Sequence, residues 1–207
     1  MMMSRKALIV AAALVVLIAG FYVKANYFYP ITNRSGSGTA IVALGDSLTY
    51  GTGAGKGEDW PSLVRKKCRC EIYNAGIPGD TTQDALSRMD KDVVSRNPRI
   101  VIVGLGGNDV LQRQPEEQMF RNLREVITRA QRNGAMVVLL GLNGFPLGGS
   151  LASGYKALAK ETGSVYVPDI MGGILSNPKL KSDQIHPNAA GYQVMAEKIY
   201  NRLEPYL

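Results

Sequence analysis

Five short apolar runs alternate with segments of helical character from residue 39 onward. The runs are apolar throughout, which is typical of strands that are covered on both faces. The alternation therefore predicts a three-layer α/β/α domain around a parallel sheet of about five strands. The expected strands are Thr39–Leu44, Glu71–Asn74, Arg99–Leu105, Ala135–Leu142 and Val165–Val167. The expected helices are Trp60–Lys67, Thr82–Arg96, Pro115–Arg132, Leu151–Glu161 and Ala189–Leu203.

Unusual polar residues follow these strands at the points where each strand is expected to end. Asp46 and Ser47 follow the first strand, residues 76–80 the second and residues 107–109 the third. Residues 183–186 lie in the loop between the fifth strand and the last helix. In open α/β sheets the functional loops lie beyond the carboxyl ends of the strands. We therefore expect these four segments to converge on one site.

The residue types in these segments suit acyl transfer. A serine hydroxyl such as that of Ser47 becomes a nucleophile when a base takes its proton, and His186 is the only histidine in the chain. Asp183 lies three residues before His186, where its carboxylate can orient the imidazole and fix its tautomer. The backbone N–H of Gly79 and the side-chain amide of Asn108 are candidate donors to an oxyanion. A single histidine also excludes the usual catalytic zinc sites.

The same residues resemble the four sequence blocks of the GDSL family, also called SGNH hydrolases. The matching blocks are GlyAspSerLeu at 45–48, AsnAlaGlyIleProGlyAsp at 74–80, GlyGlyAsnAsp at 106–109 and AspGlnIleHisPro at 183–187. The resemblance covers roughly residues 39–205. By its length and by Trp60-Pro61 after the first block, the chain is most similar to the bacterial thioesterase I/lysophospholipase/arylesterase group.

This resemblance implies a flavodoxin-like fold and ester hydrolysis without a metal or cofactor. It implies that Ser47 attacks the carbonyl, that His186 acts as base and then as acid, and that Asp183 orients His186. The implied oxyanion donors are the backbone N–H groups of Ser47 and Gly79 and the Asn108 amide. The substrate stays open: lysophospholipid, acyl or aryl esters or thioesters are favoured, and O-acetyl groups on envelope glycans are the alternative.

A non-catalytic periplasmic binding domain is a further, less favoured interpretation, because such a domain has no need of a nucleophile, a base and two oxyanion donors together. The net charge of +7 does not indicate a nucleic-acid partner, because the basic residues are scattered among acids with no aromatic platform beside them. We expect the chain to act as a monomer on a small-molecule or lipid ester.

The N-terminal segment is an anchor or an export signal. Arg5 and Lys6 precede an uninterrupted apolar stretch over residues 7–23, which as a helix spans about 25 Å. That length lies between the core of a signal peptide and a membrane-spanning helix. We expect residues 1–29 to hold the protein in a bacterial inner membrane with its catalytic domain in the periplasm, and cleavage near Ala25 is the alternative. Residues 30–38 are expected to form a flexible tether to a domain over residues 39–207.

Cys68 and Cys70 are the only cysteines, so no disulfide framework holds the fold. If both lay on a strand they would point to the same face, where a disulfide is strained. The sequence leaves their oxidation state open.

Overall fold

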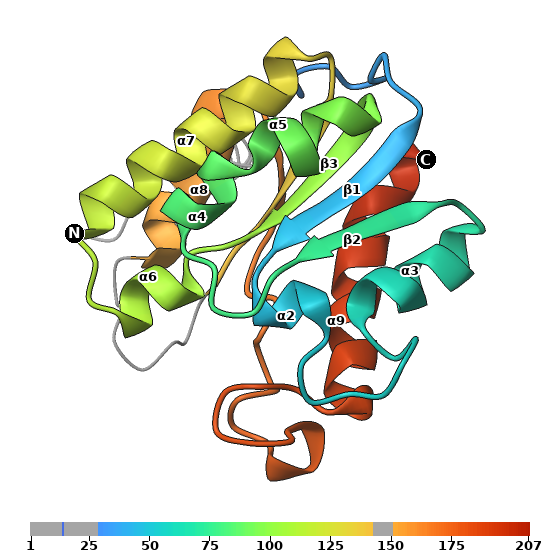
Figure 1. Ribbon diagram of the computed structural model, residues 1–207, viewed down its shortest axis with the longest axis vertical. Coiled ribbons are helices and arrows are strands. Elements are labelled where there is room, and N and C mark those ends of the chain that lie inside the picture. The colour runs from blue at the N-terminus through green and yellow to red at the C-terminus, as the bar shows by residue number, and fades with distance from the viewer. Residues whose placement is uncertain (1–13, 15–28, 143–150) are drawn as a thin grey trace, which may run out of the picture. The chain divides into compact units, whose positions relative to one another are not determined.

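A five-stranded parallel sheet forms the centre of the domain (Figure 1). The computed structural model describes residue 14, residues 29–142 and residues 151–207. The strands are β1 (Ala40–Gly45), β2 (Ile72–Gly76), β3 (Pro98–Gly104), β4 (Met136–Leu140) and β5 (Val165–Val167). Their order is β2-β1-β3-β4-β5, which is the flavodoxin-like order and confirms the predicted fold class.

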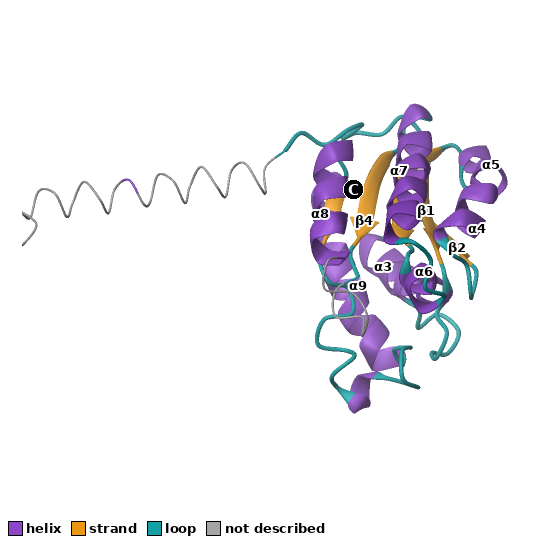
Figure 2. Ribbon diagram, turned by 90° about the vertical axis from the view of Figure 1, so that its left-hand side faces the viewer, coloured by secondary structure: helices purple, strands orange, loops and turns teal. Residues whose placement is uncertain are grey.

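Helices cover both faces of this sheet. In Figure 1, α4, α5, α7 and α8 lie on one face, and α3 and α9 lie on the other. Figure 2 looks onto the face that α7 and α8 cover. The helices are α2 (Ser47–Tyr50), α3 (Trp60–Cys68), α4 (Thr82–Ser87), α5 (Met89–Asp92), α6 (Gly107–Leu111), α7 (Glu116–Arg132), α8 (Leu151–Thr162) and α9 (Ala189–Leu203). Within the described ranges the short 3-10 turns are η1 (Val94–Arg96), η2 (Pro178–Leu180) and η3 (Glu204–Tyr206).

The core lies between the sheet and the two helical layers. Every residue of β1 and of β4 is buried, as expected for strands covered on both faces. Among the described helices α7 is the longest, and it packs on the sheet through an apolar stripe at three- and four-residue spacing. The buried apolar residues of this stripe are Met119, Leu123, Val126, Ile127 and Ala130.

The single helix expected over Thr82–Arg96 is wrong. The segment is broken into α4, α5 and η1, and Arg88 separates the first two at φ −105° and ψ 8°. The Arg88 side chain turns inward and binds groups at the ends of β1 and β2, instead of pointing to solvent from a continuous helix.

The flexible tether expected over residues 30–38 is also wrong from Ile31 onward. Ile31–Leu207 forms one compact unit, and the backbone and side chains of residues 32–37 hydrogen-bond to its surface. The folded domain therefore begins about eight residues earlier than position 39. Representative contacts are Thr32 N–H to Gly163 C=O (2.9 Å), Asn33 Nδ2 to Gln131 C=O (2.7 Å) and Ser37 N–H to Gly134 C=O (3.1 Å).

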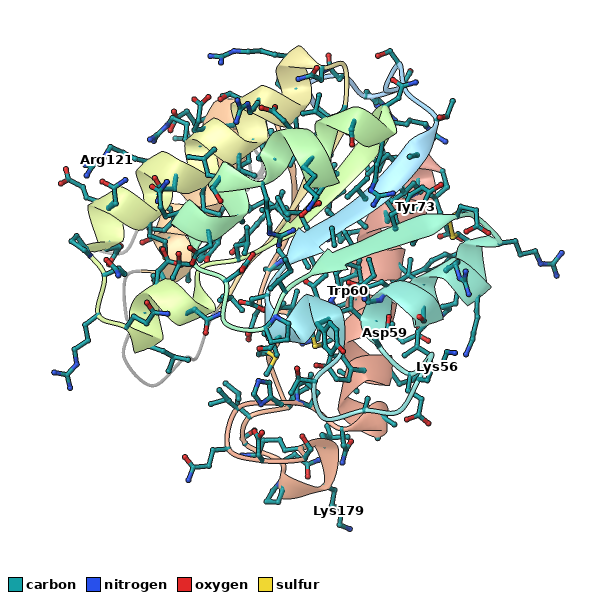
Figure 3. The ribbon with its side chains drawn as sticks, viewed as in Figure 1. Lys56, Asp59, Trp60, Tyr73, Arg121 and Lys179 are labelled. Carbon is teal, nitrogen blue, oxygen red and sulfur yellow. A yellow bond between two sulfur atoms is a disulfide. The ribbon has the colours of Figure 1, made fainter. Side chains whose placement is uncertain are left out.

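The two cysteines form a disulfide, drawn in yellow in Figure 3. They do not share a strand: Cys68 ends α3, Arg69 caps it in the left-handed conformation at φ 54°, and Cys70 precedes β2. The turn between helix and strand brings their Cα atoms to 5.1 Å, within the usual range for a disulfide.

The apolar stretch over residues 7–23 lies outside the described residues, except for position 14. Within the part of the chain that the structure describes, no helix has both the length and the apolar character needed to cross a membrane.

Candidate active site

Ser47 lies where β1, an interior strand of the sheet, passes into α2. Asp46 is the N-cap of this helix, and its buried carboxylate accepts a hydrogen bond from the Leu48 N–H at 2.9 Å. An N-cap of this kind satisfies a backbone donor at the first turn of a helix. The cap therefore fixes the turn that carries Ser47 at the carboxyl end of the sheet.

His186 reaches Ser47 from a loop that lies 139 residues further along the chain. His186 Nε2 is 3.0 Å from Ser47 Oγ, and His186 Nδ1 is 2.7 Å from Asp183 Oδ2. An ionised carboxylate only accepts, so Nδ1 donates to Asp183 and leaves Nε2 as the acceptor for the serine hydroxyl. The three side chains form one continuous line of contacts.

The loop of residues 168–188 that carries the imidazole lies beyond the carboxyl end of β1 (Figure 1). Figure 3 labels Lys179 at its far end. The two arms of the loop pair at Lys181 and Pro187, and the Ser182 N–H donates to the His186 C=O at 3.0 Å. Asn188 N–H closes the loop by donating to the Leu180 C=O at 3.0 Å, immediately before α9.

Asp183 is held by its own loop. Its Oδ1 accepts from the backbone N–H groups of Ile185 at 2.9 Å and His186 at 2.7 Å. Hydrogen bonds from the His186 side chain and these backbone groups lower the pKa of Asp183 from 3.8 to about 2. Burial acts in the opposite direction on Asp46, where it raises the pKa from 3.8 to about 7.

The candidate oxyanion donors come from the segments that follow β1, β2 and β3. The loop after β2 places Gly79 at φ +90°, a conformation that strains residues with a Cβ, and a Cβ there would meet no atom within 4 Å. Among the described residues, no protein acceptor is found for the backbone N–H of Ser47 or of Gly79. Asn108 Nδ2 donates one hydrogen bond to the Asp80 C=O at 2.8 Å, and an amide nitrogen carries a second N–H for a ligand.

Two further side chains, those of Asp109 and Arg88, support these segments, and the sequence motifs do not predict a role for either. Asp109 accepts from the Thr82 N–H at 2.9 Å and the Thr82 hydroxyl at 2.6 Å, which anchors the turn of Asn108 to the start of α4. Arg88 binds the Asp80 carboxylate at 2.7 Å. The sequence signal for Asp109 is its place directly after Asn108, whereas Arg88 is one scattered basic residue among many.

Comparison with known proteins gives a consistent result. The family model described as "GDSL-like Lipase/Acylhydrolase family" matches residues 43–194. Esterase TesA of Pseudomonas aeruginosa is 29% identical over 188 residues, which are 86% of this chain and 93% of the relative. Thioesterase 1/protease 1/lysophospholipase L1 of Escherichia coli is 29% identical over 183 residues, which are 84% of this chain and 88% of the relative. A crystal structure of TesA superposes with a TM-score of 0.77 and 28% identity over 81% of this chain and 99% of that one.

Proposed function

Because the chain belongs to the GDSL-like lipase/acylhydrolase family and is an ester hydrolase, we propose that Ser47, His186 and Asp183 are its catalytic triad. The observation that carries the proposal is the unbroken line of contacts from Asp183 Oδ2 through the imidazole to Ser47 Oγ. The family's blocks predict the same three residues from sequence, and the fold joins them from two distant segments.

The geometry supports a two-step mechanism. Ser47 Oγ attacks the ester or thioester carbonyl while His186 Nε2 takes its proton, and the imidazolium is stabilised by Asp183. The oxyanion forms beside the N–H groups of Ser47 and Gly79 and the Asn108 amide. His186 then protonates the leaving alcohol or thiol, which leaves an acyl group on Ser47. Water, deprotonated by His186, attacks this acyl-enzyme, and Ser47 regains its proton.

Exposed apolar side chains around the nucleophile favour an acyl or aryl substrate. Tyr50 lies in the turn of α2 that begins at Ser47, Ile77 precedes Gly79 by two residues, and Leu111 ends the helix that carries Asn108. These side chains are 58%, 43% and 42% exposed, respectively. Each of the three segments that carry the candidate oxyanion donors thus presents one apolar side chain to solvent, where an acyl chain can cover it. The thioesterase and lysophospholipase named among the relatives agree with this substrate class.

A chain-length series tests the substrate class. Purified protein is assayed with p-nitrophenyl esters from acetate to palmitate, with lysophosphatidylcholine and with acetylated xylan, beside the S47A variant. We expect kcat/KM to rise with acyl length beyond acetate and lysophospholipid to be cleaved. Preference for acetate and acetylated glycan would support the O-acetyl esterase alternative, and binding without turnover would support a non-catalytic domain.

The N-terminal sequence supports a place in the bacterial cell envelope. Arg5 and Lys6 are expected to stay in the cytoplasm, with the apolar stretch 7–23 as an inner-membrane anchor and the domain in the periplasm. We expect the full chain to sediment with membranes and to resist extraction by salt. A soluble periplasmic product that begins near Asn26 would instead identify a cleaved signal peptide.

A further inference from the structure

Arg88 is a largely buried cation at the carboxyl end of the sheet. It lies between α4 and α5, and its side chain is only 11% exposed. All three guanidinium nitrogens are used. Nε donates to Asp80 Oδ2 at 2.7 Å and Nη1 to Asp92 Oδ2 at 3.1 Å, while Nη2 donates to the backbone carbonyls of Ala75 at 2.9 Å and Gly45 at 3.1 Å.

The groups that Arg88 binds are next to the candidate oxyanion donors. Gly45 ends β1 two residues before Ser47, and Ala75 lies in β2 just before the loop that carries Gly79. Asp80 directly follows Gly79, and its own carbonyl is the acceptor of the Asn108 amide at 2.8 Å. Arg88 therefore binds two of the three segments that carry the donors, and the third, that of Asn108, is hydrogen-bonded to Asp80.

We propose that Arg88 is a positioning residue that sets the spacing of the oxyanion donors at Ser47, Gly79 and Asn108, an inference that rests on the proposed function. Arg88 does not contact the reacting atoms in this role. It acts through Asp80 on two of the donors and through the Gly45 carbonyl on the turn of the third.

The chemistry of the guanidinium explains why this position needs arginine. Its planar fork presents donors in several fixed directions, so it can bind two carboxylates and two carbonyls at once. A lysine ammonium is a compact charge on a flexible stem and cannot hold the same four acceptors in place. Burial raises the pKa of Asp80, and the hydrogen bond from Arg88 opposes that rise.

The test is Arg88→Lys in the full chain, assayed in detergent with p-nitrophenyl butyrate. An oxyanion exists only near the transition state, so displaced donors lower kcat and leave KM nearly unchanged. We expect kcat to fall by about 10- to 100-fold, since a displacement of 1 Å can cost about 10²-fold, and KM to stay within about twofold. The matched control is Arg124→Lys, which changes an exposed two-bond ion pair with Glu161 and is expected to keep wild-type kcat.

A double-mutant cycle with Asn108→Ala separates positioning from a general loss of structure. If Arg88 acts through the donors, the loss of kcat caused by Arg88→Lys becomes smaller in the Asn108→Ala background. Equal losses in both backgrounds, or a kcat of Arg88→Lys within twofold of wild type, would overturn the proposal.

If Arg88→Lys does not fold, Asp80→Ala decides the question. This variant removes the carboxylate that Arg88 binds and keeps the backbone carbonyl that accepts from Asn108. A folded Asp80→Ala protein with lower kcat and unchanged KM supports the proposal, and one with wild-type kcat overturns it. The wild-type and S47A proteins test the proposed function separately. If the wild type hydrolyses the ester and S47A does not, the proposed function holds whatever the result for Arg88. If the wild type does not hydrolyse it, both the proposed function and the role of Arg88 are overturned.

Discussion

The two halves of the active site are built in different ways. The half that carries Ser47 belongs to the sheet: Asp46 and Asp109 are each 3% exposed, and the largely buried Arg88 binds backbone carbonyls at the ends of β1 and β2. The half that carries His186 is a loop outside the sheet, where the Asp183 side chain is 51% exposed and is held mainly by backbone groups of its own turn. The nucleophile is thus positioned by the core, and the base by local hydrogen bonds.

The same difference shifts the pKa values of two carboxyl groups of the site in opposite directions. Burial raises the pKa of Asp46 to about 7, so in the fold this group keeps its proton only below about pH 7. Hydrogen bonds from His186 and from the turn lower the pKa of Asp183 to about 2, which keeps it ionised. An ionised Asp183 can stabilise an imidazolium, whereas Asp46 serves as a cap. We therefore expect substitution of Asp183 to lower the rate, and substitution of Asp46 to change the pH dependence of stability.

The largest effect is expected for Ser47→Ala. Loss of the nucleophile leaves only the rate that the oxyanion donors and binding supply, so kcat should fall by about 10³- to 10⁶-fold. Steady-state hydrolysis of p-nitrophenyl butyrate measures the loss, and circular dichroism checks the fold. Ser87→Ala, which changes an exposed hydroxyl in α4, is the control and should keep its activity. More than a tenth of the wild-type kcat in Ser47→Ala would reject Ser47 as the nucleophile.

The second-largest effect is expected for Asp183→Asn, in the loop that carries His186. Asp183→Asn keeps an acceptor for the backbone N–H groups but removes the charge that orients His186, so we expect kcat to fall by about 10⁴-fold. Because the side chain is half exposed, the midpoint of thermal unfolding should change little. Asp90→Asn, at a more exposed ion pair with Arg129, controls for the loss of one negative charge. A change of less than tenfold in the kcat of Asp183→Asn would show that the imidazole is oriented without the carboxylate.

The third effect isolates the oxyanion. Removal of the amide in Asn108→Ala should lower kcat by about 10²- to 10³-fold and leave KM within about twofold, because the oxyanion exists only in the transition state. Asn133→Ala removes an exposed amide that caps the end of α7 and is the matched control. An effect confined to KM would identify Asn108 as a substrate-binding residue instead.

The sequence predicted the sheet well because its strands are buried on both faces, a pattern that is visible without tertiary information. The expected bounds of Val165–Val167 and Ala189–Leu203 coincide with β5 and α9. The polar segments were placed at strand ends by the same logic, and the structure brings Ser47, Asp183 and His186 into contact. Their catalytic roles remain predictions.

The features that the sequence did not predict depend on partners far away in the chain. The break at Arg88 is supported by carbonyls of β1 and β2, and Gly45 lies 43 residues away from it. The docking of residues 31–38 uses acceptors such as the Gln131 carbonyl, 98 residues from Asn33. Local composition indicates one helix over residues 82–96 and a flexible tether over residues 31–38. Long-range hydrogen bonds break the helix and dock the tether instead.

The last prediction concerns stability, with no change in the catalytic groups, and tests the buried half directly. The folded-state pKa of Asp46, about 7, lies above the ordinary value of 3.8. Between these values the folded protein keeps a proton that the unfolded chain releases, so the free energy of unfolding falls as pH rises through this window. For one group the slope is at most about 1.4 kcal/mol per pH unit. Asp46→Asn still accepts from the Leu48 N–H but cannot ionise, so it should lack this slope.

Urea unfolding from pH 4 to pH 8 should show the wild type losing stability relative to Asp46→Asn up to about pH 7, with no further relative change above it. Asp90→Asn, whose carboxylate is exposed, should run parallel to the wild type. Parallel curves for the wild type and Asp46→Asn would mean that Asp46 is ionised in the fold at low pH, and that the two halves do not differ in the way described.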